Sequence, residues 1–358
     1  MIIIIIFILI KSNRDKQVTR NILKSFIFGT ILIPFAGTLS AKEVNLYSYR
    51  QPFLINQILK HFTKQSGIKV NVVYAKKGML ERLKAEGRNT PADAVLTVDI
   101  SRLSALADAG LLQSVTSAKL EENIPPQYRH PDGLWFGLTL RARVAYAHKE
   151  RVKDGEIKQY TDLIKPRFKG RVCTRSGKHA YNLSLLAAVI DEMGEKGAEN
   201  WARGLKANLA RRPKGNDRTQ VKAIKEGLCD VSLGNSYYLG NMETNEKNPE
   251  QKEWANSVRL LFPKLGGKGT HVNISGVAMT KYAKNKLNAK KLLEFLSSSV
   301  AQKMYAEQNF EYPVKPGVAW SSRVKSWGTF LPSDVNLATI AKHRLKATKI
   351  MDIVNFDG

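Results

Sequence analysis

Two adjacent tyrosines, Tyr237 and Tyr238, have the clearest capacity for chemistry in this sequence. They lie in the segment Gly234-Asn-Ser-Tyr-Tyr-Leu-Gly240, which follows an apolar, strand-like run and precedes an expected helix. A phenol that loses its proton offers a metal cation an anionic oxygen ligand. Neighbouring side chains of a strand face opposite sides, so both phenols can face one site only if the chain bends here. A tyrosine pair that only packs against its neighbours is the alternative interpretation.

Other metal-binding or catalytic patterns are weak. The sequence holds six histidines, and we expect four of them to be non-ligands: His61, His130, His148 and His343. It contains no Gly-x-Ser-x-Gly elbow, no P-loop and no His-Glu-x-x-His motif. A nucleophile made of Cys173 and His179 is the one enzymatic alternative, and a cysteine in an apolar strand is expected to be an inert thiol. We therefore expect no enzyme.

The two cysteines, Cys173 and Cys229, each lie in an apolar, strand-like segment. A chain that matures in an oxidising compartment can join them in one disulfide. Two buried free thiols are an equally good interpretation. A zinc site is not expected from two thiols without paired histidines.

The elements that must position these residues alternate between strand and helix. After residue 41 the pattern predicts strands at 44–49, 68–74 and 93–97, and helices at 52–66, 78–86 and 100–109. A longer strand-like run at 134–146 suits a crossover. A second series of strands and helices follows it and includes expected helices at 181–192 and 199–208. Such alternation predicts α/β lobes with largely parallel sheets covered by helices. Two such lobes joined by crossing strands form a hinged cleft.

The first 41 residues differ from the rest and are typical of an export signal. A basic stretch from Lys16 to Lys24 precedes an apolar core, and small residues end at Ser40-Ala41, after which we expect cleavage. An additional apolar run at residues 1–10 is too short to span a bilayer, and we interpret it as the product of a misplaced start codon. A retained membrane anchor is the alternative.

The chain is strongly basic, with 57 Lys and Arg against 31 Asp and Glu in 358 residues. Cleavage after residue 41 removes five basic residues and one acidic residue, which leaves a net charge of +22. The basic residues are scattered among acidic ones, and no nucleic-acid recognition motif accompanies them. We expect a solvated basic surface and no nucleic-acid partner.

Several segments, taken together and in order, resemble the periplasmic ferric-iron-binding proteins of ABC importers. The resemblance covers nearly the whole chain after the signal. Its segments are Tyr47-Ser-Tyr-Arg50, Lys84-Ala-Glu-Gly-Arg-Asn-Thr-Pro-Ala-Asp93, Pro131-Asp-Gly-Leu-Trp-Phe-Gly137, Gly215-Asn-Asp217, Gly234-Asn-Ser-Tyr-Tyr238 and Gly269-Thr-His-Val-Asn-Ile-Ser-Gly276.

The resemblance implies a ligand set of three tyrosines from the second lobe. The family's tyrosine at a helix start matches Tyr181, within His179-Ala-Tyr-Asn-Leu-Ser-Leu185, and its tyrosine pair matches Tyr237 and Tyr238. Fe(III) is a hard, highly charged cation that prefers anionic oxygen ligands. His179 is then expected near the cleft, and His271 in the packing of the hinge.

The first lobe departs from the family pattern. Many relatives carry a His-Tyr pair after the first strand, where this chain has Gln51 and Pro52. A first-lobe ligand must then come from Tyr49, from Gln51 or from a small anion. Relatives that lack the pair often use carbonate held by arginine, and Arg50 and Arg141 match the positions for that role. Ordinary salt bridges are the alternative for both arginines.

The resemblance implies a two-lobed periplasmic-binding-protein fold. We expect residues 42–140 and about 265–312 in the first lobe, and residues 141–264 and about 313–358 in the second. The implied function is periplasmic capture of Fe(III) by a monomer and its delivery to the permease of an ABC importer in the inner membrane. The alternative cargo is a small organic or phosphorylated anion.

Overall fold

The computed structural model describes residues 42–358, so the expected signal segment 1–41 lies outside the described residues. The first part of the described chain alternates strands and helices as predicted. Its elements are β1 (Glu43–Ser48), α1 (Asn56–Ser66), β2 (Lys69–Tyr74), α2 (Met79–Glu86), β3 (Ala94–Thr97), α3 (Ile100–Asp108), β4 (Leu112–Gln113) and α4 (Ala118–Asn123). β1 pairs in parallel with both β2 and β3, which is the pairing expected of a βαβ opening.

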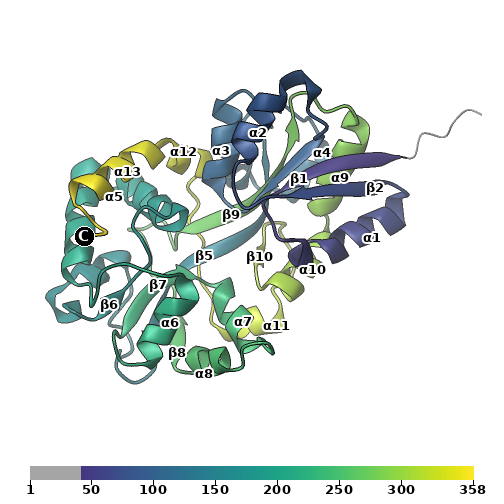
Figure 1. Ribbon diagram of the computed structural model, residues 1–358. Helices are drawn as coiled ribbons and strands as arrows, with labels where there is room; N and C mark the ends of the chain where they lie inside the picture. Colours follow the sequence, from purple (N-terminus) through teal and green to yellow (C-terminus); the bar gives the residue numbers. More distant parts are fainter. Residues whose placement is uncertain (1–41) are drawn as a thin grey trace, which may run out of the picture. The chain divides into compact units, whose positions relative to one another are not determined.

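The second part of the chain builds the elements that carry the candidate tyrosines. They are β5 (Phe136–His148), β6 (Val172–Cys173), α5 (Ala180–Ala207), α6 (Asp217–Lys225), β7 (Val231–Asn235), α7 (Tyr237–Glu243), α8 (Glu250–Asn256) and β8 (Val258–Leu261). β6 and β7 run parallel, and β5 pairs antiparallel with both β7 and β8. A second small sheet is thereby formed around the far half of β5 (Figure 1).

The last part of the chain returns to the first sheet and then to the second group of helices. Its elements are β9 (Val272–Thr280), α9 (Lys286–Leu296), α10 (Ser299–Asn309), β10 (Tyr312–Pro313), α11 (Ser322–Ser326), α12 (Leu337–Lys342) and α13 (Arg344–Ile353). β9 pairs antiparallel with β3 and with the first half of β5. α12 packs on α3 and on α5, and α13 packs on α5. Short 3-10 turns lie at Pro52–Leu54, Gly87–Asn89, Pro126–Tyr128, Tyr160–Ile164 and Pro166–Phe168.

β5 is the strand shared by the two lobes. Residues 136–142 pair with β9, and residues 143–148 pair with β7 and β8, so the same strand leaves one lobe and enters the other. Twelve of its thirteen residues are buried, which explains why the sequence shows a continuous apolar run there and no alternation. The predicted α/β fold with two lobes and crossing strands is confirmed. The prediction of largely parallel sheets is wrong, because β5 and β9 pair antiparallel with their neighbours and, of the described strand pairs, only β1–β2, β1–β3 and β6–β7 are parallel.

Two glycines set the lengths of important helices. Gly67 adopts the left-handed conformation, with φ of 68°, and ends α1 where the sequence predicts. Gly194 has φ of 71° and ψ of 173° inside α5, so the backbone breaks there. The two helices that the sequence predicts at 181–192 and 199–208 therefore form one element with an interruption.

The two cysteines are joined in a disulfide, Cys173 to Cys229, with their Cα atoms 5.9 Å apart. The parallel pairing of β6 with β7 brings the two positions together, because Cys173 lies opposite Ser232. A Cys173 nucleophile, the enzymatic alternative, has no free thiol in this arrangement. Within residues 42–358, no helix is both long enough and apolar enough to cross a membrane.

Candidate metal centre

Tyr237 and Tyr238 are the first two residues of α7, directly after β7 ends at Asn235. Successive side chains on a helix point about 100° apart, whereas on a strand they point to opposite faces. The change from strand to helix is the bend that the tyrosine pair requires. Their rings lie together, with centroids 4.3 Å apart, and both side chains are partly exposed.

Tyr181 joins this pair from a different element. It is the second residue of α5, and its phenol oxygen lies 3.4 Å from that of Tyr237. His179 caps the helix, because its Nδ1 accepts a hydrogen bond from the backbone N–H of Tyr181 at 3.2 Å, and its ring lies edge-on against the Tyr181 ring. The three tyrosines that the resemblance implied are thus neighbours in space.

The environment of Tyr237 and Tyr238 keeps both of them protonated in the absence of metal. Burial raises the pKa of Tyr237 well above its usual value, and the neighbouring Tyr181 and Tyr238 raise it further. Burial also raises the pKa of Tyr238, and the neighbouring Tyr181 and Asp217 raise it further. A cation that binds here must displace phenol protons. Three phenolates close together would repel one another, and a bound cation removes that repulsion.

Arginines surround the three rings. The guanidinium carbons of Arg141, Arg143 and Arg175 lie 5.9, 6.0 and 5.3 Å from the centroid of the Tyr181 ring. That of Arg218 lies 5.4 Å from the Tyr238 ring. These positive charges stabilise phenolates once the protons have left.

A buried carboxylate holds two of these arginines. Asp217, at the start of α6, is fully buried and lies 3.4 Å from Arg143 Nη1 and 3.1 Å from Arg175 Nη1. Arg143 also donates to the side chains of Asn182 and Asn235. Asp217 ends the segment Gly215-Asn-Asp217, which belongs to the resemblance, and no role was predicted for it. An aspartate at a helix start offered no further signal, because its partners lie far away in the sequence.

Arg141 carries a positive charge with no carboxylate partner among the described residues. It is 2% exposed, its Nη2 donates to the backbone oxygens of Val98 and Ile274, and its Nε has no hydrogen-bond partner in this part of the chain. Burial acts to lower the pKa of Arg141, but Tyr181 and then Glu311 outweigh it, and the pKa is raised. Among residues 42–358 it makes no salt bridge. A buried, unpaired cation is costly, so the site favours a negative charge beside it.

Arg50 differs from Arg141 in this respect. Its Nη2 lies 2.8 Å from Glu311 Oε2 and also donates to the hydroxyl of Ser275. Its guanidinium lies over the ring of Tyr305, at 5.4 Å, and contacts none of the three tyrosines in the described part of the chain. The structure therefore brings Arg141 to the tyrosines, while Arg50 has a carboxylate partner of its own.

The first-lobe candidates, Tyr49 and Gln51, lie at the end of β1. The Tyr49 oxygen accepts a hydrogen bond from the backbone N–H of Met79 at 3.1 Å, and the guanidinium of Arg102 lies over its ring at 4.0 Å. Burial raises the pKa of Tyr49. Gln51 is exposed and precedes the turn that Pro52 starts. The Tyr49 oxygen is thus occupied by α2, and the Gln51 side chain is open to solvent.

Histidines and acidic residues of the described chain, residues 42–358, do not form a competing metal site. Within the described residues, no group of three or more His, Cys, Asp or Glu side chains is placed to hold an ion. His271 is buried, and its Nε2 lies 3.1 Å from the hydroxyl of Ser184. Burial, and then the charge of Arg143, lower the pKa of His271 to about 3, so it stays neutral. It contributes to packing between β9 and α5, as expected.

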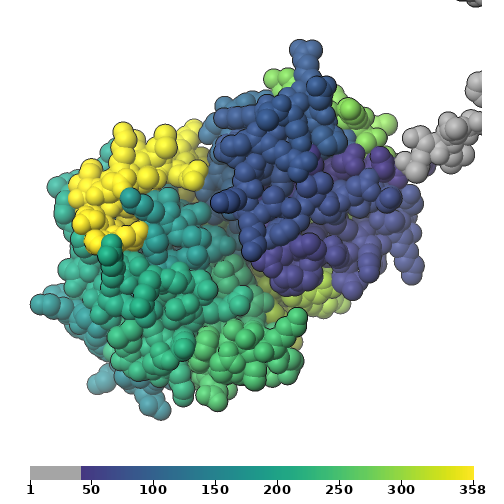
Figure 2. Space-filling view, viewed as in Figure 1, coloured from purple at the N-terminus to yellow at the C-terminus, as the bar shows by residue number. Residues whose placement is uncertain are grey.

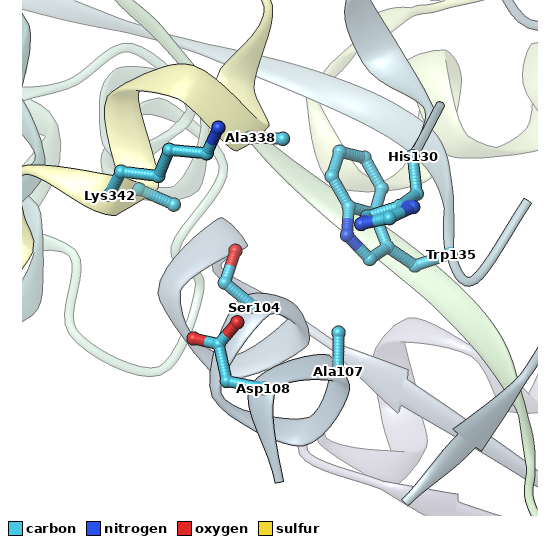
Figure 3. Close-up of a pocket in the computed structure, with 8 residues that line it drawn as sticks. Ser104, Ala107, Asp108, His130, Trp135, Ala338 and Lys342 are labelled. Atoms are coloured by element: carbon cyan, nitrogen blue, oxygen red, sulfur yellow. The ribbon is translucent and has the colours of Figure 1, made fainter. Parts of the chain in front are cut away.

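A separate small cavity of about 80 Å³ lies between α3 and α12. Ser104 and Asp108 lie on one side and Lys342 on the other, with the Trp135 and His130 rings next to them (Figure 3). It contains one carboxylate and one imidazole, and burial lowers the pKa of His130. None of the three tyrosines lines it, so the cavity is distinct from the candidate metal centre.

Comparisons with known proteins agree with this architecture. Residues 89–336 match the family of bacterial extracellular solute-binding proteins. The chain belongs to this family. This solute-binding protein is 44% identical to iron uptake protein A1 of Synechocystis over 312 residues, which cover 87% of the chain and 86% of that relative.

Solved structures of other solute-binding proteins are also similar. The ferric iron-binding protein A of Mannheimia haemolytica, in an open conformation, is 53% identical, with a TM-score of 0.85 over 89% of this chain and all of that one. A Trichodesmium protein in complex with iron and citrate is 42% identical, with a TM-score of 0.84 over 88% of this chain and 99% of that one.

Proposed function

We propose that this solute-binding protein binds Fe(III) in the periplasm through Tyr181, Tyr237 and Tyr238 and delivers it to the permease of an ABC importer. The observation that carries the proposal is the meeting of three phenols from two helix starts, with the oxygens of Tyr181 and Tyr237 3.4 Å apart. Hard oxygen donors of this kind suit Fe(III), and they lie beside arginines that stabilise phenolates. The names of the similar proteins support iron as the cargo.

A small anion, carbonate in the simplest case, completes the site at Arg141. Three phenolates balance the three charges of Fe(III), so the buried charge of Arg141 needs one further anion. The unpartnered Nε of Arg141 is a suitable donor to a planar oxyanion. Arg50 contributes less, because Glu311 already neutralises it. An anion at Arg141 also supplies the further ligand that Gln51 and Tyr49 do not provide.

The lobes close over the metal about β5 and β9. The first lobe comprises residues 42–140 and about 265–312, and the second comprises residues 141–264 and about 313–358. Asn273 on β9 links them, because its Nδ2 donates to Asp99 at 2.8 Å and to Ser184 at 3.1 Å. The protein acts as a monomer that is exported by means of residues 1–41.

Titration of the purified protein with Fe(III) tests the function. A phenolate-to-iron charge-transfer band must appear at one iron per chain and must weaken in Tyr181→Phe. Tyr282→Phe is the matched control, since the Tyr282 side chain lies near Lys281 and Arg88 and away from the three ligands. Absence of the band, together with calorimetric binding of organic or phosphorylated anions without iron, would establish the alternative cargo.

A further inference from the structure

The C-terminal segment lies against the turn that precedes Tyr181. Figure 2 shows the end of the chain, in yellow, on the surface formed by the second lobe, and α13 packs on α5. Met351 and Phe356 are buried there. A Cβ atom at Gly177 would lie 2.6 Å from the Phe356 ring and 2.8 Å from the Met351 sulfur. The turn and the tail are therefore in close contact, and a side chain at position 177 would have to displace Phe356 or Met351.

Asp357 connects the tail to this turn. Its Oδ1 accepts a hydrogen bond from the backbone N–H of Gly177 at 2.7 Å, and its Oδ2 accepts one from the hydroxyl of Ser176 at 2.5 Å. Arg212 holds the other side of the residue, because its Nε donates to the backbone oxygen of Asp357 at 2.6 Å. One carboxylate thus receives two hydrogen bonds from consecutive residues of the turn.

The turn determines where α5 begins. The Ser176 hydroxyl accepts a hydrogen bond from the N–H of Lys178 at 3.2 Å, and the Ser176 carbonyl accepts one from the N–H of His179 at 3.1 Å. The side chain of Asn182 donates to the same carbonyl at 3.1 Å. Tyr181 lies between these anchored residues. Its position relative to the tyrosines of α7 therefore depends on the turn.

We propose that Asp357 is a positioning residue for iron binding, which holds the turn at Ser176 and Gly177 so that the Tyr181 phenol meets Tyr237. This inference rests on the proposed function. Partners of a metal ligand that do not touch the metal typically change affinity roughly 10–100-fold when they are removed. Asp357 acts through the backbone that carries Tyr181, and it touches neither the metal nor the phenol.

The test compares Asp357→Ala with Asp352→Ala. Both variants remove one negative charge from the tail, but the side chain of Asp352 pairs, within the described residues, only with the exposed ammonium group of Lys178, at 2.5 Å. We expect Asp357→Ala to lower the affinity for Fe(III), supplied as its nitrilotriacetate chelate, about tenfold or more and to weaken the charge-transfer band. Asp352→Ala keeps wild-type affinity, because exposed ion pairs contribute little. Thermal unfolding of the iron-free variants shows that each is folded.

A double-mutant cycle separates positioning from general destabilisation. If Asp357 acts through Tyr181, then Asp357→Ala causes little further loss in a Tyr181→Phe background. An equal loss in both backgrounds, or an unchanged affinity of Asp357→Ala, overturns the proposal. Ser176→Ala removes one of the two hydrogen bonds and provides the same comparison if Asp357→Ala does not fold. Failure of the unsubstituted protein to bind iron would overturn the proposed function itself.

Discussion

Replacement of Tyr237 by phenylalanine removes one proton from the binding reaction as well as one ligand. A phenol with a pKa near 10 is about 0.1% ionised at pH 7, and burial raises the pKa of Tyr237 further. Each ligating phenol therefore releases close to one whole proton when iron binds. We expect about three protons per iron from the phenols of the wild type and about two from Tyr237→Phe.

The same count sets the pH dependence of binding. Affinity for Fe(III) rises about tenfold per pH unit for each proton released. One pH unit therefore raises the affinity about a thousandfold for the wild type and about a hundredfold for Tyr237→Phe. Proton release is measured with an indicator dye in weak buffer, at one pH and with the same iron chelate for both proteins. Protons taken up or released by the chelate then cancel when the wild type is compared with Tyr237→Phe. Tyr282→Phe must release the same number as the wild type.

Two results would contradict the role of Tyr237 as an iron ligand. Equal proton release by the wild type and Tyr237→Phe would mean that Tyr237 is not a ligand. Release of one proton fewer by Tyr282→Phe would mean that the difference does not come from the candidate site. A loss of affinity without a change in proton count would assign Tyr237 to packing against Tyr238, 4.3 Å away between ring centroids.

Three further predictions follow from other parts of the structure. Arg141→Gln weakens iron binding more than Arg141→Lys, because lysine keeps the positive charge that holds the anion. Chelator competition with and without carbonate measures both losses, and equal losses would mean that no anion binds at Arg141. Replacing Cys173 and Cys229 by alanine lowers the free energy of unfolding in urea by about 4 kcal/mol for a loop of 56 residues, without changing the iron band. Burial acts to raise the pKa of Asp230, but hydrogen bonds from Arg171 and Arg151 outweigh it and lower the pKa. The ionised carboxylate therefore stabilises the fold above about pH 4, and this contribution is lost as the pH falls further. Asp230→Asn should reduce the dependence of the free energy of unfolding on pH in this acidic range, measured by urea unfolding.

Local patterns in the sequence predicted most of the elements but not all of their details. β1, β2 and β3 lie within a residue of their predicted bounds, because apolar runs between turn residues determine strands locally. The break at Gly194 falls in the predicted gap between the helices at 181–192 and 199–208, and only its length differs, because the backbone deviates at one residue. The helices α12 and α13 near the C-terminus were not predicted, because short helices gain most of their stability from tertiary packing, here on α5.

The candidate site divides in a similar way. The tyrosine pair follows from the sequence, because its two members are adjacent and the strand ends just before them. Tyr181 was available only through the resemblance, since no local pattern connects it with a residue 56 positions away. The Asp217 carboxylate between two arginines had no sequence signal at all.

By itself, the sequence determined the elements, the adjacent tyrosines and the choice of a fold with alternating strands and helices. These depend on side-chain periodicity and turn residues within a few positions of each other. The tertiary structure alone decided that Cys173 pairs with Cys229, that the Nε of Arg141 has no hydrogen-bond partner within residues 42–358, and that Asp357 contacts the turn before Tyr181. Each of these depends on which strands and helices lie side by side, and many pairings are compatible with one pattern of apolar residues.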